Sequence, residues 1–78
     1  MADLTLYYRP FCPYCRKVMD FMAANNMEAP LKNIMESEDN IKELELIGGK
    51  PQVPCLVIDG QAMYESDDII RWLQKNNE

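Results

Sequence analysis

Pro13 separates two stretches of different periodicity, and this change constrains the fold more than any other feature of the sequence. Before it, Leu4–Tyr8 is a short apolar and aromatic run of the kind that forms a strand. After it, Val18 and Met22 recur at helical spacing. Proline suits the first position of a helix, because the amide hydrogen that it lacks would have no partner there. We therefore predict a strand that leads into a helix beginning at Pro13 and ending near residues 25–26.

The next stretch predicts a second strand and a second helix. Residues 29–35 have the composition of a strand, in which we expect Leu31 and Ile34 to be buried. Ser37 is a suitable N-cap for the following helix. The pair Gly48-Gly49 predicts the end of that helix, where a positive φ is needed.

The last third of the chain predicts a hairpin and a third helix. Cys55–Ile58 is a continuous apolar run, which is typical of a central strand. Asp59-Gly60 is a strong signal for a two-residue hairpin turn, so residues 61–64 should form the return strand. Ser66 is a candidate N-cap for the final helix. The order βαβαββα implies a right-handed crossover between two parallel strands, followed by an antiparallel pair. The sequence thus predicts an α/β domain with a four-stranded mixed sheet and three helices.

Composition narrows the possible functions. The chain has 78 residues, enough for one domain spanning residues 1–78. Its net charge of -5 argues against nucleic acid or an anionic membrane as a partner. The absence of histidine excludes Ser-His and Cys-His catalysis and most zinc chemistry. We find neither the features of a secretory signal nor an apolar stretch long enough to cross a bilayer, and we expect a cytoplasmic protein.

The three cysteines are the main candidates for chemistry. Cys12 and Cys15 form a C-x-x-C motif at the junction of the first strand and helix, and Cys55 stands apart. A disulfide scaffold would need an even number of cysteines, and a zinc site would need four ligands where only Cys55 and carboxylates remain to complete one. In a reducing compartment such a pair is more often catalytic or metal-binding than structural. We therefore predict a reactive dithiol and expect no metal.

The two thiols should differ in reactivity. With Cys12 at the N-cap, its sulfur faces the unpaired amides and the positive end of the helix dipole. Arg9 and Arg16 add positive charge nearby. All these effects favour a thiolate, so we expect the pKa of Cys12 to lie well below that of a free thiol. Cys15 lies deeper in the helix and should have the higher pKa. Tyr14 is either an ordinary exposed aromatic or a surface for a thiol substrate.

Three further positions each allow two interpretations from the residues alone. If Pro54 is cis, it holds the backbone of Val53 open for pairing with an incoming peptide; otherwise it is an ordinary loop proline. Cys55 is more readily explained as a small buried hydrophobic residue than as a redox group. Ser66 and Asp67 are either helix-capping residues or groups that hold a ligand carboxylate and ammonium.

At these positions the chain resembles a dithiol glutaredoxin. The resemblance rests on C-P-Y-C at residues 12–15, on Val53-Pro54, and on the S-D-D segment that follows the hairpin. It implies a thioredoxin fold, a cis Pro54, and glutathione as reductant and cosubstrate. The segment beginning at Glu65-Ser66 is also similar to the glutathione-binding turn of glutathione-transferase N-terminal domains, although we expect no transferase C-terminal domain.

The resemblance also implies roles for individual residues. Cys12 would be the nucleophile and Cys15 the resolving thiol. The glutathione-binding residues would be Arg9 at the glycyl carboxylate, Tyr14 beside the ligand, Val53 and Pro54 at its cysteinyl backbone, and Ser66 and Asp67 at its γ-glutamyl end. The family usually has threonine where Gln52 stands and a Gly-Gly pair where Tyr64-Glu65 stands, which predicts a glutathione site of altered shape.

Together these features predict a glutathione-dependent thiol–disulfide oxidoreductase that serves electron transport and cell redox homeostasis. Its expected partners are glutathione and disulfide-bonded or glutathionylated proteins, and we expect a monomer. Two alternatives stay open. A redoxin reduced by thioredoxin reductase would use the same dithiol, and a glutathione-assisted carrier of iron–sulfur clusters would use Cys12.

Overall fold

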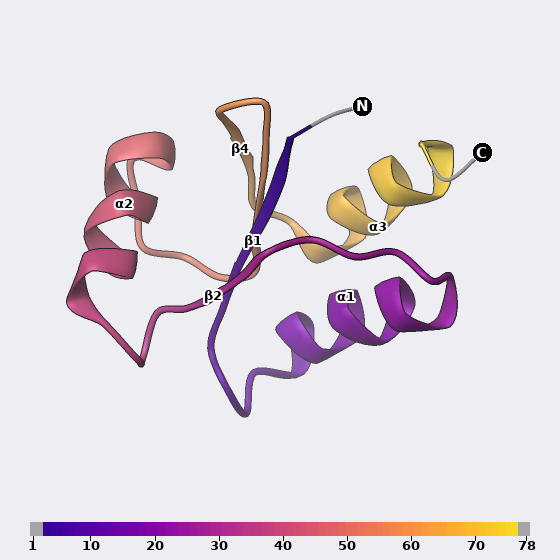
Figure 1. The fold of residues 1–78 in the computed structure, drawn as a ribbon, viewed down its shortest axis with the longest axis horizontal. Helices are drawn as coiled ribbons and strands as arrows, with labels where there is room; N and C mark the ends of the chain where they lie inside the picture. The colour runs from indigo at the N-terminus through magenta and orange to yellow at the C-terminus, as the bar shows by residue number, and fades with distance from the viewer. Residues whose placement is uncertain (1–2, 77–78) are drawn as a thin grey trace.

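Four strands form a single mixed sheet in the computed structural model, which describes residues 3–76 (Figure 1). The strand order is β2-β1-β3-β4. β1 runs parallel to β2, and β3 runs antiparallel to both β1 and β4. The strands are β1 (Leu4–Tyr8), β2 (Leu31–Asn33), β3 (Cys55–Ile58) and β4 (Gln61–Met63). The predicted βαβαββα order and the central position of β3 are confirmed.

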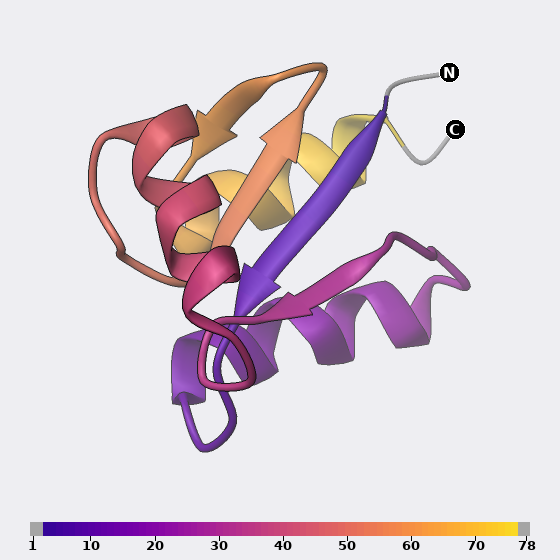
Figure 2. The same ribbon diagram turned by 60° about the vertical axis from the view of Figure 1, so that its left-hand side comes forward.

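Three helices cover the two faces of this sheet. They are α1 (Pro13–Ala24), α2 (Glu38–Gly48) and α3 (Ser66–Lys75). α1 and α3 lie on one face and α2 lies on the other, as Figures 1 and 2 show from two directions. Within residues 3–76, no helix has the length and apolar character needed to cross a membrane.

Several helix and turn signals act as predicted. α1 begins at Pro13, and the Ser37 hydroxyl caps α2 by accepting from the Asp39 amide at 3.1 Å. α2 ends at Gly48, and its C-cap Gly49 has a φ of 88°, which lies in the left-handed region. In the β3–β4 turn, Asp59 and Gly60 have φ values of 50° and 86°, as a type I′ hairpin turn requires.

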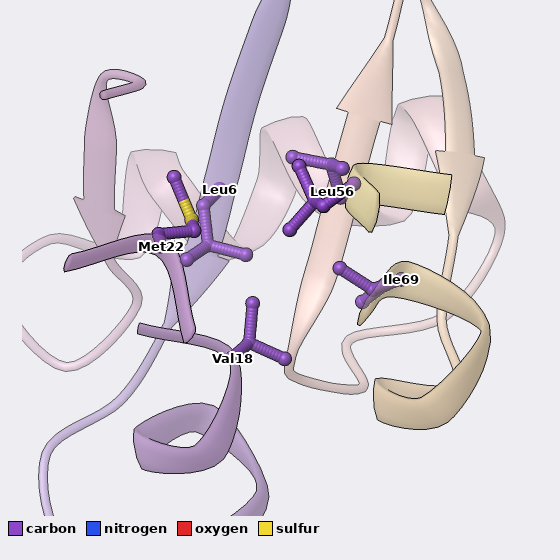
Figure 3. Packing of buried hydrophobic residues seen from close by; sticks show 6 residues of the cluster. Leu6, Val18, Met22, Leu56 and Ile69 are labelled. Atoms are coloured by element: carbon purple, nitrogen blue, oxygen red, sulfur yellow. The ribbon is translucent and has the colours of Figure 1, made fainter. Parts of the chain in front are cut away.

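The sheet separates two apolar clusters. The cluster beneath α1 and α3 is built from Leu6, Val18, Met22, Leu56, Ile69 and Leu73 (Figure 3). The cluster beneath α2 is built from Tyr7, Ile34, Leu44, Cys55 and Val57. Successive residues of β1 point to opposite faces, so Leu6 joins the first cluster and Tyr7 the second. This alternation anchors β1, the strand that leads directly to the C-x-x-C motif.

The second strand differs from the prediction. It covers only Leu31–Asn33 instead of residues 29–35, and Leu31, which we expected to be buried, is 49% exposed. The reason is that β2 forms the edge of the sheet, so that one side of Leu31 has no neighbouring strand. The strand then ends in a turn, where the Asn33 side chain accepts from the Met35 amide at 2.8 Å. Ile34 is buried, as predicted.

The start of the third helix also differs by one residue. We predicted Ser66 as the N-cap, but the N-cap is Glu65, and Ser66 is the first helical residue. The first helical hydrogen bond runs from the Ile69 amide to the Glu65 carbonyl at 2.8 Å, which fixes this boundary. The return strand correspondingly ends at Met63 rather than at residue 64. Tyr64 leaves the strand and donates its hydroxyl to the Lys50 carbonyl at 2.8 Å.

Candidate functional site

The topology brings three segments to one end of the sheet. β3 is antiparallel to both β1 and β4, so β1 and β4 end where β3 begins. The starts of α1 and α3 and the loop before β3 therefore lie at this end (Figure 2). Cys12, Pro54 and Ser66 belong to these three segments. An ion pair between Lys17 Nζ and Asp67 Oδ1, 2.5 Å long, links α1 directly to α3.

Cys12 occupies the N-cap of α1 and is 7% exposed. Its backbone is extended, and its Sγ accepts a hydrogen bond from the Cys15 amide at 3.4 Å. Burial by itself raises the pKa of the Cys12 thiol. Hydrogen bonds from the Cys15 thiol, from the Cys15 and Tyr14 amides and from the Arg9 side chain outweigh burial and hold the pKa of Cys12 below its ordinary value. The shift is in the predicted direction.

Cys15 has the opposite character. It is buried in the first turn of α1, and burial together with the neighbouring Cys12 sulfur raises its pKa. Both cysteines are free thiols in this structure. As pH rises, Cys12 is therefore the first of the two to become a thiolate, while Cys15 retains its proton. This difference in pKa distinguishes the sulfur that can attack first, Cys12, from the sulfur that can attack in a later step, Cys15.

Of the two arginines expected to support the thiolate, Arg9 donates a hydrogen bond that lowers the pKa of Cys12. Arg16 instead lies 3.8 Å from Asp20, one helical turn further along the exposed surface of α1. The two residues are four positions apart, the spacing at which side chains on a helix meet. That Arg16 also stabilises the Cys12 thiolate stays a prediction.

Two aromatic residues beside Cys12 face solvent. Tyr14 is 64% exposed on the first turn of α1. Phe11 is fully exposed and has a φ of 63°, a left-handed conformation that is uncommon for a bulky residue. The sequence analysis missed Phe11. The signal that could have revealed it is an aromatic residue between Pro10 and a reactive cysteine.

The loop before β3 contains a cis peptide bond between Val53 and Pro54, as the resemblance implied. Pro54 is buried and Val53 is half-buried. Cys55 follows directly but points away from this end of the site, into the cluster beneath α2. Cys55 is completely buried, and burial raises its pKa to about 11. These properties agree with Cys55 as a small hydrophobic residue of the core.

The start of α3 holds the last two predicted residues. Ser66 is half-buried at the first helical position, and Asp67 is exposed next to it. Asp67 forms an ion pair with Lys17, and the hydrogen bond from Lys17 lowers the pKa of the Asp67 carboxyl group. The sequence analysis did not single out Lys17, because 50 residues separate it from Asp67. A ligand ammonium that approaches Asp67 meets a carboxylate that already has a cationic partner.

Comparison with known proteins places these features in context. Residues 6–78 match the model of the glutathione S-transferase N-terminal domain family. The chain is 22% identical to an uncharacterized glutaredoxin-like 8.6 kDa protein in the rubredoxin operon of Clostridium pasteurianum, over 92% of this chain and 99% of that protein.

Solved structures of thioredoxin-like and glutathione transferase proteins also superpose on this chain. The thioredoxin-like protein BC3987 superposes with a TM-score of 0.79 at 25% identity, over 92% of this chain and 96% of that one. Glutathione transferase Omega 3C from Trametes versicolor superposes with a TM-score of 0.80 at 28% identity, over 95% of this chain but only 33% of the transferase. The predicted thioredoxin fold and the similarity to glutaredoxins are therefore confirmed.

Proposed function

Because the chain belongs to the glutathione S-transferase N-terminal domain family and is a glutaredoxin-like protein, we propose that it is a glutathione-dependent thiol–disulfide oxidoreductase. Its substrates are protein disulfides and mixed disulfides between proteins and glutathione, and it acts as a cytoplasmic monomer. The observation that carries the proposal is the placement of the two free thiols at the start of α1, where the Cys12 sulfur caps the helix and accepts from the Cys15 amide at 3.4 Å, and Cys15 is buried. The pKa of Cys12 is lowered, whereas that of Cys15 is raised.

The proposed reaction proceeds by two successive exchanges. The Cys12 thiolate attacks one sulfur of the substrate disulfide and forms a mixed disulfide, and the other sulfur leaves as a thiolate. Cys15, after losing its proton, then attacks the Cys12 sulfur, so that a Cys12–Cys15 disulfide forms and the second substrate sulfur leaves as a thiolate. In the alternative route a glutathione thiolate attacks the Cys12 sulfur instead, and this glutathione is the first of the two that are consumed. The substrate gains two electrons. Two glutathione molecules subsequently supply two electrons to the oxidised protein and leave as glutathione disulfide.

The groups around Cys12 support a glutathione site. The guanidinium of Arg9 is a partner for the glycyl carboxylate, and the aromatic ring of Tyr14 can flank the ligand. The backbone of Val53, next to the cis Pro54, can pair with the cysteinyl residue. At the start of α3, the free amides and the Ser66 hydroxyl suit the γ-glutamyl carboxylate. The γ-glutamyl ammonium would share Asp67 with Lys17.

The Lys17–Asp67 ion pair also favours a second candidate function. Because Asp67 is already paired, and because Tyr64 stands where glutaredoxins usually have glycine, glutathione could bind weakly. The same dithiol could then receive its electrons from thioredoxin reductase. Both candidates share the chemistry of Cys12 and Cys15 and differ only in the reductant.

One coupled assay separates the two candidates. The oxidised protein is mixed with NADPH and either glutathione plus glutathione reductase, or thioredoxin reductase alone. We expect NADPH consumption in the glutathione system, and consumption only with thioredoxin reductase would overturn the glutathione assignment. A Cys12→Ser variant should be inactive in both systems and serves as the blank.

A further inference from the structure

A cavity of about 590 Å3 opens beside Cys12, and of the glutathione-binding residues proposed above only Arg9 is among the described residues that line it. Its walls include Tyr8, Arg9, Phe11, Cys12, Arg16 and Met19. Among the described residues that line it, none comes from the loop before β3 or from the start of α3. The nucleophile therefore borders two different surfaces. One carries Val53, Ser66 and Asp67, and the other is this cavity.

The lining of the cavity combines apolar surface with positive charge. Tyr8, Phe11 and Met19 supply the apolar part, and the Phe11 ring is fully exposed in the free protein. Arg9 and Arg16 supply two positive charges, and no acidic residue is among the described residues that line the cavity. In a chain of net charge -5, such a cationic apolar surface beside the reactive sulfur is distinctive. It is complementary to a ligand with an acidic group next to an apolar one.

Arg16 is available for such a ligand. Its separation of 3.8 Å from Asp20 is long for an ion pair, and both side chains are largely exposed. An exposed pair of this kind contributes little stability and can exchange partners readily. A carboxylate held in the cavity could therefore recruit the Arg16 guanidinium.

The apolar surface continues beyond the cavity along α1. Met19 also lines a neighbouring hollow of about 610 Å3, together with Met22, Met27 and Leu31. This second hollow lies between α1 and the segment that leads into β2. The two hollows share Met19, and we call them together the groove; it begins at Cys12, and its far end also carries Glu28. Methionine side chains adapt to different apolar partners, which suits a surface that binds several protein segments.

We propose that this groove binds the protein half of the substrate, and that it selects cysteines flanked by an acidic and a large apolar residue. The inference rests on the proposed function and adds a substrate class to it. An extended segment advances about 3.3 Å per residue, so residues one or two positions from a substrate cysteine whose disulfide lies against Cys12 can reach Phe11 and Arg16. When the substrate thiolate leaves, these contacts are lost together with the disulfide bond.

The test compares two peptides, each joined through its cysteine to glutathione as a mixed disulfide. One peptide has the sequence Leu-Glu-Cys at its centre, and the other has Ser-Lys-Cys. The assay measures kcat/KM with glutathione, glutathione reductase and NADPH. Each value is divided by the rate at which free glutathione reduces the same peptide without the protein. This correction is needed because neighbouring charges also change the pKa of the leaving thiol and hence its intrinsic rate. We expect a preference of about tenfold for the Leu-Glu-Cys peptide, the size typical of burying one apolar side chain.

Variants then assign the preference to the groove. Phe11→Ala should remove most of the preference that comes from the peptide leucine. Arg16→Gln should remove the part of the preference that comes from the peptide glutamate. The preference of the wild-type protein should fall with added salt, since salt screens exposed charges. The preference of the Arg16→Gln variant should not depend on salt. Leu46→Ala and Lys42→Gln are matched controls, because both residues are exposed on α2, on the other face of the sheet. Both controls should retain the full preference.

The outcomes distinguish this inference from the proposed function. A wild-type protein that reduces neither peptide with glutathione refutes the proposed function and the substrate class that rests on it. A protein that reduces both peptides at equal normalised rates retains the proposed function but overturns the groove. A preference that survives both Phe11→Ala and Arg16→Gln likewise overturns it.

Discussion

A methyl group added at Gly48 should destabilise the protein through a single neighbour. A Cβ built on Gly48, the last residue of α2, would lie 1.8 Å from the Tyr64 hydroxyl oxygen and 2.6 Å from Cζ of the same ring. The ring would have to move, and its hydrogen bond to the Lys50 carbonyl, 2.8 Å long, would be strained or lost. Tyr64 therefore forces position 48 to be glycine.

The size of the effect follows from two opposing contributions. Overpacking of this kind costs about 1–3 kcal/mol. Alanine in place of glycine in a helix stabilises by about 0.5–1 kcal/mol. For Gly48→Ala we therefore expect a net loss of about 1–2 kcal/mol in the free energy of unfolding. In a Tyr64→Ala background only the favourable part remains, and the same substitution should stabilise by about 0.5–1 kcal/mol.

The assay is a double-mutant cycle measured by urea unfolding. For a domain of this size, a change of 1–2 kcal/mol moves the midpoint by about 1–2 M urea. Gly49→Ala is the matched control. Gly49 has a φ of 88° and no atom within 4 Å of a built Cβ, so alanine there should cost about 1–2 kcal/mol in either background. The reasoning is refuted if Gly48→Ala has the same effect with and without Tyr64.

Four further predictions concern the thiols and the site. Cys12→Ser should abolish exchange, whereas Cys15→Ser should still reduce glutathione mixed disulfides; full activity of the Cys12 variant would reverse the two roles. The rate of Cys12 alkylation by iodoacetamide should reach half its maximum at a pH below that of an ordinary thiol, since the pKa of Cys12 is lowered. Burial raises the pKa of Cys55 from 9.0 to about 11. The contribution of the buried neutral thiol to the free energy of unfolding is therefore fully present below pH 9 and is lost as pH rises through 11. Urea unfolding of Cys55→Ala should show a weaker decline over this window, and an unchanged decline would contradict burial as its cause. Lys17→Met should free Asp67 and raise glutathione affinity a few-fold by calorimetry; weaker binding would mean that Lys17 itself holds a glutathione carboxylate.

Local signals predicted much of the fold because they act within a few residues. Pro13 specified the start of α1, and the Asp59-Gly60 pair specified a turn with two positive φ values. Ser37 likewise capped α2 through a contact two residues away. The cis Val53-Pro54 bond was different, because only the resemblance to glutaredoxins, and no local signal, implied it.

The features that escaped prediction depend on tertiary contacts. Leu31 is exposed because β2 lies at the sheet edge, which its own composition does not reveal. The Lys17–Asp67 ion pair joins two helices that are distant in sequence. Directly before the Glu65 N-cap of α3, Tyr64 leaves β4 and donates its hydroxyl to the carbonyl of Lys50, 14 residues away in sequence. Each of these requires knowledge of which elements become neighbours.

The division of the helices between the two faces of the sheet has a practical consequence. α1 and α3 carry Cys12, Cys15, Ser66 and Asp67, whereas α2 lies on the other face (Figure 1). The outward surface of α2, around Leu46, can thus be modified far from the exchanging sulfurs. A fluorophore or immobilisation linker attached there should leave both disulfide partners free access, which would allow turnover to be followed on a solid support.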